Sequence, residues 1–138
     1  MTDTTTMSDE DFLAAFLDSS MPPAGFDHRG HVRAAWLLLQ RRPLPDAVKE
    51  TCEAILRLAT RLGVPGKYHC TLTEAMVRLM ACGGGADRSI SWEAFLAANA
   101  ALMSDARGML ARHYSTELLE SEEARMRFVP PDRLPLPT

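Results

Sequence analysis

Residues 45–63 read PDAVKETCEAILRLATRLG, and this stretch carries the spacing of a single helix. Its apolar residues recur at intervals of three and four, which is the period of one α-helical face. Pro45 suits the first position of a helix, and Gly63 suits the position just past its end. The stretch therefore predicts an amphipathic helix whose apolar face consists of Val48, Cys52, Ile55, Ala59 and Leu62.

Helical patterns continue on both sides of this stretch. Ser8, Asp27 and Ser91 are suitable N-terminal caps for three further helices. No segment alternates apolar and polar β-branched residues, so we expect no sheet. The sequence predicts an all-α fold, a compact single-domain helical bundle of about five to seven helices.

Two helices in the second half of the chain each have two candidate starting residues. Residues 71–74, TLTE, match a capping box, which would begin a helix just after Thr71. Gly66 would instead begin the same helix earlier. A shorter helix is expected from Ser104 or Asp105 to about Tyr114.

Length and composition limit the classes of function. The chain has 138 residues, a net charge of −3 and three cysteines without a CxxC pair. We expect one helical domain over residues 1–128 and a Pro-rich C-terminal tail over 129–138, extended over the surface or loose. Interspersed charge argues against nucleic acid as a partner, and no run approaches the roughly 20 apolar residues of a membrane span.

The remaining expectations concern compartment and assembly. The polar start of the chain does not resemble a signal peptide, and the cysteine usage fits a reducing compartment, so we expect a cytoplasmic protein. The sequence does not decide whether the protein forms a homodimer. Exposed apolar residues around Trp92 or the tail could form the contact between two copies.

Two histidines lie three residues apart in the helix that Asp27 begins. On a helical wheel His28 and His31 are about 60° apart, on the face that carries Val32 and Leu39. Side chains at this spacing can converge on one point, and neutral imidazole is a common metal ligand. The alternative is that each is a core residue hydrogen-bonded to a backbone carbonyl.

His69 adds a third imidazole near another helix start. Three nitrogen ligands with an open position form the pattern of catalytic zinc and also suit copper or iron. We therefore predict that His28, His31 and His69 hold one divalent transition metal, with their ring nitrogens within about 5 Å of a common point.

Other polar side chains are candidates for substrate binding or proton transfer. We expect Tyr68, Thr73 and His113 in catalytic positions, although each could be an ordinary partly buried polar group. Glu74 lies far round the wheel from His69 and is expected in the capping box instead. A nucleophilic pair of Cys70 and His69 is unfavourable, because adjacent helical residues do not face each other.

Several of these segments resemble a family of small uncharacterised bacterial helical proteins. The shared segments are FDHRGHVRAAW at 26–36, KYHCTLT at 67–73, RHYS at 112–115, and an ending with Ala124-Arg125, Val129-Pro130-Pro131-Asp132 and Leu134-Pro135. The resemblance covers nearly the whole chain and implies motif positions at His28, His31, Tyr68, His69, Thr71, Thr73, His113 and Tyr114. It implies no named activity, and Cys70 stands where the family often has an acidic residue.

The residues lead to two main hypotheses. The first is a small metal-dependent enzyme that acts on a small organic molecule, with the metal polarising the substrate or activating water or dioxygen. The second is a non-enzymatic binding protein for a metal, haem or small metabolite. A third, weaker hypothesis is an interaction module whose histidines are structural.

Overall fold

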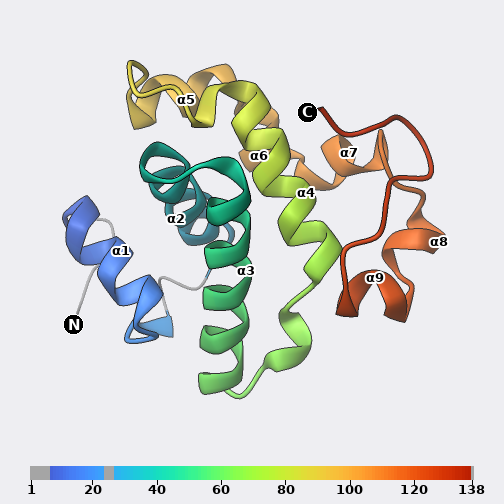
Figure 1. Ribbon diagram of the computed structural model, residues 1–138, viewed down its shortest axis with the longest axis horizontal. Coiled ribbons are helices and arrows are strands. Elements are labelled where there is room, and N and C mark those ends of the chain that lie inside the picture. Colours follow the sequence, from blue (N-terminus) through green and yellow to red (C-terminus); the bar gives the residue numbers. More distant parts are fainter. Residues whose placement is uncertain (1–6, 24–26, 138) are drawn as a thin grey trace. The chain divides into compact units, whose positions relative to one another are not determined.

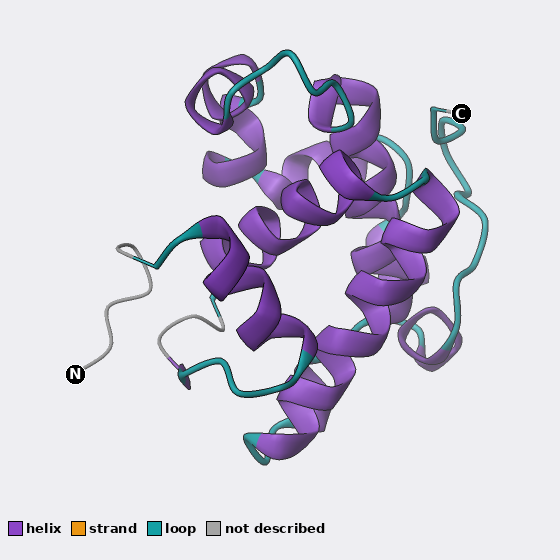
Figure 2. Ribbon diagram, turned by 60° about the vertical axis from the view of Figure 1, so that its left-hand side comes forward, coloured by secondary structure: helices purple, strands orange, loops and turns teal. Residues whose placement is uncertain are grey.

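The computed structural model describes residues 7–23 and 27–137. Within these ranges the regular elements are all helical and none is a strand, as Figure 2 shows. The prediction of an all-α fold is confirmed. Some expected features lie outside the described residues, namely residues 1–6 of the polar start of the chain, Phe26 of the segment FDHRGHVRAAW and the final Thr138.

The chain divides between Tyr68 and His69 into two compact units. The first unit contains α1 (Asp9–Leu17), α2 (His28–Arg41), α3 (Leu44–Arg61) and a 3-10 turn at Pro65–Lys67. Figure 1 shows these elements from blue to green. Helix α2 packs on α3, and α1 packs on both.

Arginine side chains fasten α1 within the first unit. Arg33 of α2 pairs with Asp9 at 3.1 Å, and its guanidinium lies 4.1 Å from the ring centre of Phe12. Arg57 and Arg61 of α3 donate to the backbone carbonyls of Leu17 and Met21. These bonds satisfy carbonyls at and beyond the C-terminal end of α1, where the helix itself offers no donor.

The second unit is built on a longer helix, α4 (Cys70–Met80), which runs into a π-helical turn at Ala81–Gly85. Five shorter helices follow, and α4 packs on the third and the last of them. They are α5 (Trp92–Ala98), α6 (Ala100–Ser104), α7 (Ala106–Ala111), α8 (Thr116–Leu119) and α9 (Glu122–Met126).

The expected caps of α1, α2 and α5 are confirmed. Ser8, Asp27 and Ser91 accept hydrogen bonds from Asp11 N, Gly30 N and Ala94 N, respectively. Asp105, one of the two expected starts of the short helix, caps α7 through Gly108 N. Local hydrogen bonds of this kind follow from the residue type and its position relative to the apolar pattern.

Both expected starts of α4 are wrong. The N-terminal cap is His69, whose Nδ1 accepts a hydrogen bond from Leu72 N at 3.0 Å. The Thr71 hydroxyl is occupied elsewhere, and Glu74 pairs with Arg78 at 2.7 Å rather than closing a capping box. A distant partner of Thr71 and a neighbouring partner of Glu74 therefore replace the expected capping box.

No helix in the described ranges combines the length and the apolar character that a bilayer crossing demands.

Candidate functional site

His28 and His31 lie in the first turn of α2. The carboxylate of Asp27 caps this turn by accepting a hydrogen bond from Gly30 N at 2.7 Å. The spacing of three residues places both imidazoles on the same side of the helix start. His28 is exposed, whereas His31 is partly buried.

This difference in burial corrects the expectation that both rings lie on a buried face. A helical wheel gives the direction of a side chain but not its depth along the helix axis. His28 is the first residue of α2, so its side chain lies at the end of the packed helix. His31, one turn further in, reaches the apolar interior beside the buried Val32.

Burial also sets the charge of His31. Desolvation, with the charge of nearby His28 as a second cause, lowers the pKa of His31 from 6.5 to about 4, while the charge of Asp27 opposes both effects. His31 is therefore a neutral imidazole near pH 7, which is the form that binds metal ions.

His69 has a defined structural role in the second unit. Because Leu72 N–H donates to Nδ1, the proton of the neutral ring must be on Nε2. Nε2 lies 2.7 Å from the carbonyl oxygen of Leu119 and donates to it. Both ring nitrogens of His69 are thus engaged, one in capping α4 and one in fixing the end of α8.

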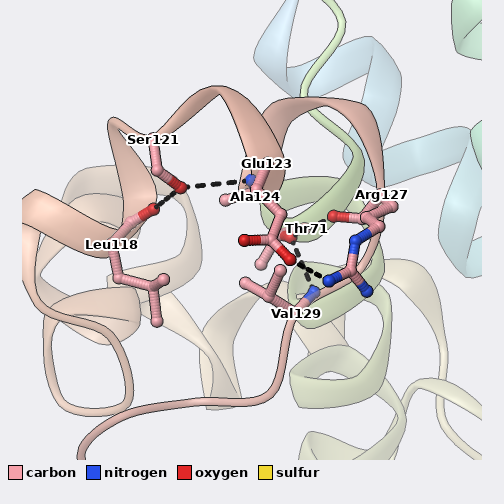
Figure 3. Close-up of polar contacts among 7 residues, drawn as sticks. All are labelled: Thr71, Leu118, Ser121, Glu123, Ala124, Arg127 and Val129. Atoms are coloured by element: carbon pink, nitrogen blue, oxygen red, sulfur yellow. Dashed lines mark hydrogen bonds and ion pairs between the residues drawn. The ribbon is translucent and has the colours of Figure 1, made fainter.

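Thr71 fixes the turn that follows α9. Its hydroxyl donates to the carbonyl of Arg127 at 2.8 Å and accepts from Val129 N at 3.1 Å, as the dashed lines of Figure 3 show. Thr71 is fully buried. A single side chain of α4 therefore satisfies two backbone groups of the C-terminal segment.

The C-terminal segment 129–137 runs extended along the second unit. The buried Tyr114 donates its hydroxyl proton to the carbonyl of Val129 at 2.8 Å. Burial, with the negative charge of Glu74 as a second cause, raises the pKa of Tyr114 to about 12. The phenol therefore stays protonated and continues to donate at ordinary pH.

His113 and Ser115 hold the same segment further along. His113 Nδ1 lies 2.9 Å from the carbonyl of Leu134, so this nitrogen carries a proton and donates it. The carboxylate of Asp132 accepts from both the backbone N and the hydroxyl of Ser115, and these bonds lower the pKa of Asp132. The segment predicted as a tail is thus bonded to the unit along most of its length.

The three predicted catalytic residues are divided between the two compact units. Tyr68 is partly buried at the end of the first unit, whereas Thr73 and His113 belong to the second. The Thr73 hydroxyl donates to the backbone carbonyl of His69 at 2.7 Å. Both Thr73 and His113 therefore serve hydrogen bonds inside the second unit.

The predicted metal ligands divide in the same way. His28 and His31 lie in the first unit and His69 in the second. Among residues 7–23 and 27–137, no three His, Cys, Asp or Glu side chains form a group arranged to hold a metal ion. The structure brings together the pair His28 and His31.

A groove of about 300 Å³ in the second unit was not predicted from the sequence. It borders α7, where Asp105 and Arg112 contribute opposite charges. Asp105 and Arg112 are seven positions apart in the sequence, a spacing that returns to the same side of a helix after two turns. This spacing is the sequence feature that could have indicated a charged groove.

No protein-family model, no curated protein and no solved structure matches this chain.

Proposed function

We propose that the protein binds a divalent transition metal through His28 and His31 and acts at that metal on a small organic molecule. The observation that carries the proposal is the placement of two imidazoles three residues apart at the start of α2, beside a carboxylate that already caps the helix. Zinc, copper and iron all accept imidazole nitrogen ligands.

The two histidines differ in what each contributes. Exposed His28 gives a metal or its substrate access from solvent. Partly buried His31 is held neutral, so it can offer a nitrogen lone pair without first losing a proton. Two protein ligands leave positions for water and substrate, at which a metal polarises a bound group or activates water or dioxygen.

His69 is the third ligand that the sequence pattern predicts, and its ligation would carry a structural cost. A metal on Nδ1 would replace the Leu72 N–H. A metal on Nε2 would displace Leu119 and move the ring proton to Nδ1, which could then no longer accept from Leu72. In either case the N-terminal cap of α4 is lost.

The second candidate function is binding without turnover, of a metal, haem or small metabolite. The observation that favours it is the engagement of Thr73 and His113 with backbone carbonyls inside the second unit. General acid–base catalysis needs a side chain free to exchange a proton with the substrate. Without these two groups, the histidine pair would bind a ligand rather than transform it.

Metal titration with matched variants tests the proposal. The apo protein is titrated with Zn²⁺, Cu²⁺ and Fe²⁺ against a chromophoric chelator, and His28→Gln, His31→Gln and Arg29→Gln are compared. We expect about one metal per chain and at least about a tenfold loss of affinity in each histidine variant. Arg29→Gln, an exposed change in the same helical turn, should bind as the native protein does.

Two further results separate the alternatives. His69→Asn keeps a side chain able to cap α4 but removes the imidazole, so a weakened affinity in this variant assigns His69 as the third ligand. Unchanged affinity limits the protein ligands to the first pair. Native affinity in both His28→Gln and His31→Gln would overturn the metal proposal.

A further inference from the structure

The groove beside α7 has the dimensions and chemistry of a small-molecule site. Its volume of about 300 Å³ lies at the lower end of the range for ligand pockets. The lining comes entirely from the second unit, from the end of α5, from α6 and from α7. The lining residues are Ala98, Asn99, Ala100, Ala101, Leu102, Asp105, Gly108, Met109 and Arg112.

One side of α7 forms a wall of the groove. Asp105, Gly108, Met109 and Arg112 follow one another at intervals of three, one and three residues, so they share a helix face. Asp105 and Arg112 are the N-terminal and C-terminal caps of α7, and the seven rises between them span about 10 Å along a helix axis. The wall therefore presents a carboxylate at one end, a guanidinium at the other and an apolar thioether between them.

The two charges have no ion-pair partner within the described parts of the chain. Asp105 accepts a hydrogen bond from Gly108 N through Oδ1, which leaves its second oxygen for other contacts. A Cβ at position 108 would clash with Asp105 Oδ2, so a larger residue there would shift the carboxylate. The glycine thus keeps space for the carboxylate at the groove wall.

From these features we propose that the groove binds a small zwitterion whose ammonium and carboxylate groups stand at opposite ends of an aliphatic chain. The ammonium donates to Asp105, and the carboxylate accepts from the fork of Arg112 donors. The aliphatic chain contacts Met109 and the exposed alanines of the lining, Ala98, Ala100 and Ala101. This site involves no histidine, so it goes beyond the metal proposal and stands or falls independently of it.

Calorimetric titration of the full chain with 6-aminohexanoate tests the inference. Hexanoate and hexylamine, which each lack one charge, are the matched ligands. Because each end is a charge-assisted hydrogen bond, each single-charge ligand should bind at least about tenfold more weakly. Removal of either charge from the protein should have a similar effect.

The variants are Arg112→Gln and Asp105→Asn, with Arg107→Gln as the control. Asparagine retains the capping ability of Asp105, so α7 keeps its N-terminal cap. Arg107 is exposed on α7 and does not line the groove. We expect about a tenfold or greater loss of affinity in both groove variants and none in the control.

Three results would overturn the inference. The first is no saturable binding of 6-aminohexanoate up to about 10 mM. The second is equal affinity for 6-aminohexanoate and hexanoate or hexylamine. The third is unchanged affinity in Arg112→Gln and Asp105→Asn, with circular dichroism showing that both variants are folded.

Discussion

At the scale of single residues, His69 and His31 show how different the surroundings of two imidazoles can be in one chain. His69 uses both ring nitrogens to hold backbone groups of its own unit. His31 is kept neutral by burial at the start of α2. The first is a structural residue by its contacts, and the second has the protonation state that metal binding needs.

Replacement of His69 should cost stability. His69→Ala removes the cap of α4 and leaves the Leu119 carbonyl without its donor, so we expect a loss of about 1–3 kcal/mol in the free energy of unfolding. His69→Asn should recover part of this loss, because asparagine caps helices well. Urea denaturation measures both variants, and a native midpoint for His69→Ala would contradict the structural role.

The burial of His31 predicts an acid-sensitive fold. The pKa of His31 is lowered from 6.5 to about 4 in the folded protein, so the unfolded chain binds more protons between these values. Stability contributed by neutral His31 is therefore present above about pH 6.5 and is lost as pH falls toward 4, by on the order of 3 kcal/mol.

The comparison that isolates this effect is the metal-free native protein against His31→Leu, which cannot titrate at that position. The free energy of unfolding is measured by urea denaturation from pH 7 to pH 4. The native protein should lose stability more steeply than the variant across this interval. Parallel curves would show that His31 does not titrate with a lowered pKa.

At the scale of elements, the second unit is held together by bonds that join α4 and the turn after α7 to the C-terminal segment. Thr71, Tyr114 and His113 each bond a backbone carbonyl of that segment or of the turn before it. These residues lie in two of the sequence segments singled out above, KYHCTLT at 67–73 and RHYS at 112–115. Their hydrogen bonds give those motif positions a structural explanation that needs no chemistry.

Thr71→Val tests this arrangement, because valine keeps the shape but removes the hydroxyl. The Arg127 carbonyl and the Val129 N–H would both lose a partner in a buried place, with an expected cost of about 2–4 kcal/mol. Thr71→Ser keeps the hydroxyl and loses a methyl group, at a cost of about 1 kcal/mol. Equal stability of the two variants in thermal or urea unfolding would contradict the bridging role.

The helix starts show which parts of the fold the sequence could reveal. Ser8, Asp27 and Ser91 bond to an amide three residues away, so their effect depends on the local sequence alone. Thr71 bonds to residues 56 and 58 positions away, and this non-local competition cannot be read from TLTE. For this reason the sequence alone could not place the start of α4.

At the scale of the whole molecule, the chain consists of two compact helical units joined between Tyr68 and His69. The histidine pair belongs to the first unit, and the groove beside α7 belongs to the second. The sequence could nominate His28 and His31, because their spacing is local. It could not anticipate that His69 is engaged on both ring nitrogens, because the Leu119 carbonyl lies 50 positions away.

Metal binding by His28 and His31 is measured through the affinity of the full metal-free chain for Zn²⁺ in competition with a chelator. We expect about one ion per native chain, at least about a tenfold weaker binding in His28→Gln and in His31→Gln, and native binding in Arg29→Gln. Binding of less than about 0.1 ion per native chain, or equal affinity in all four proteins, would contradict it.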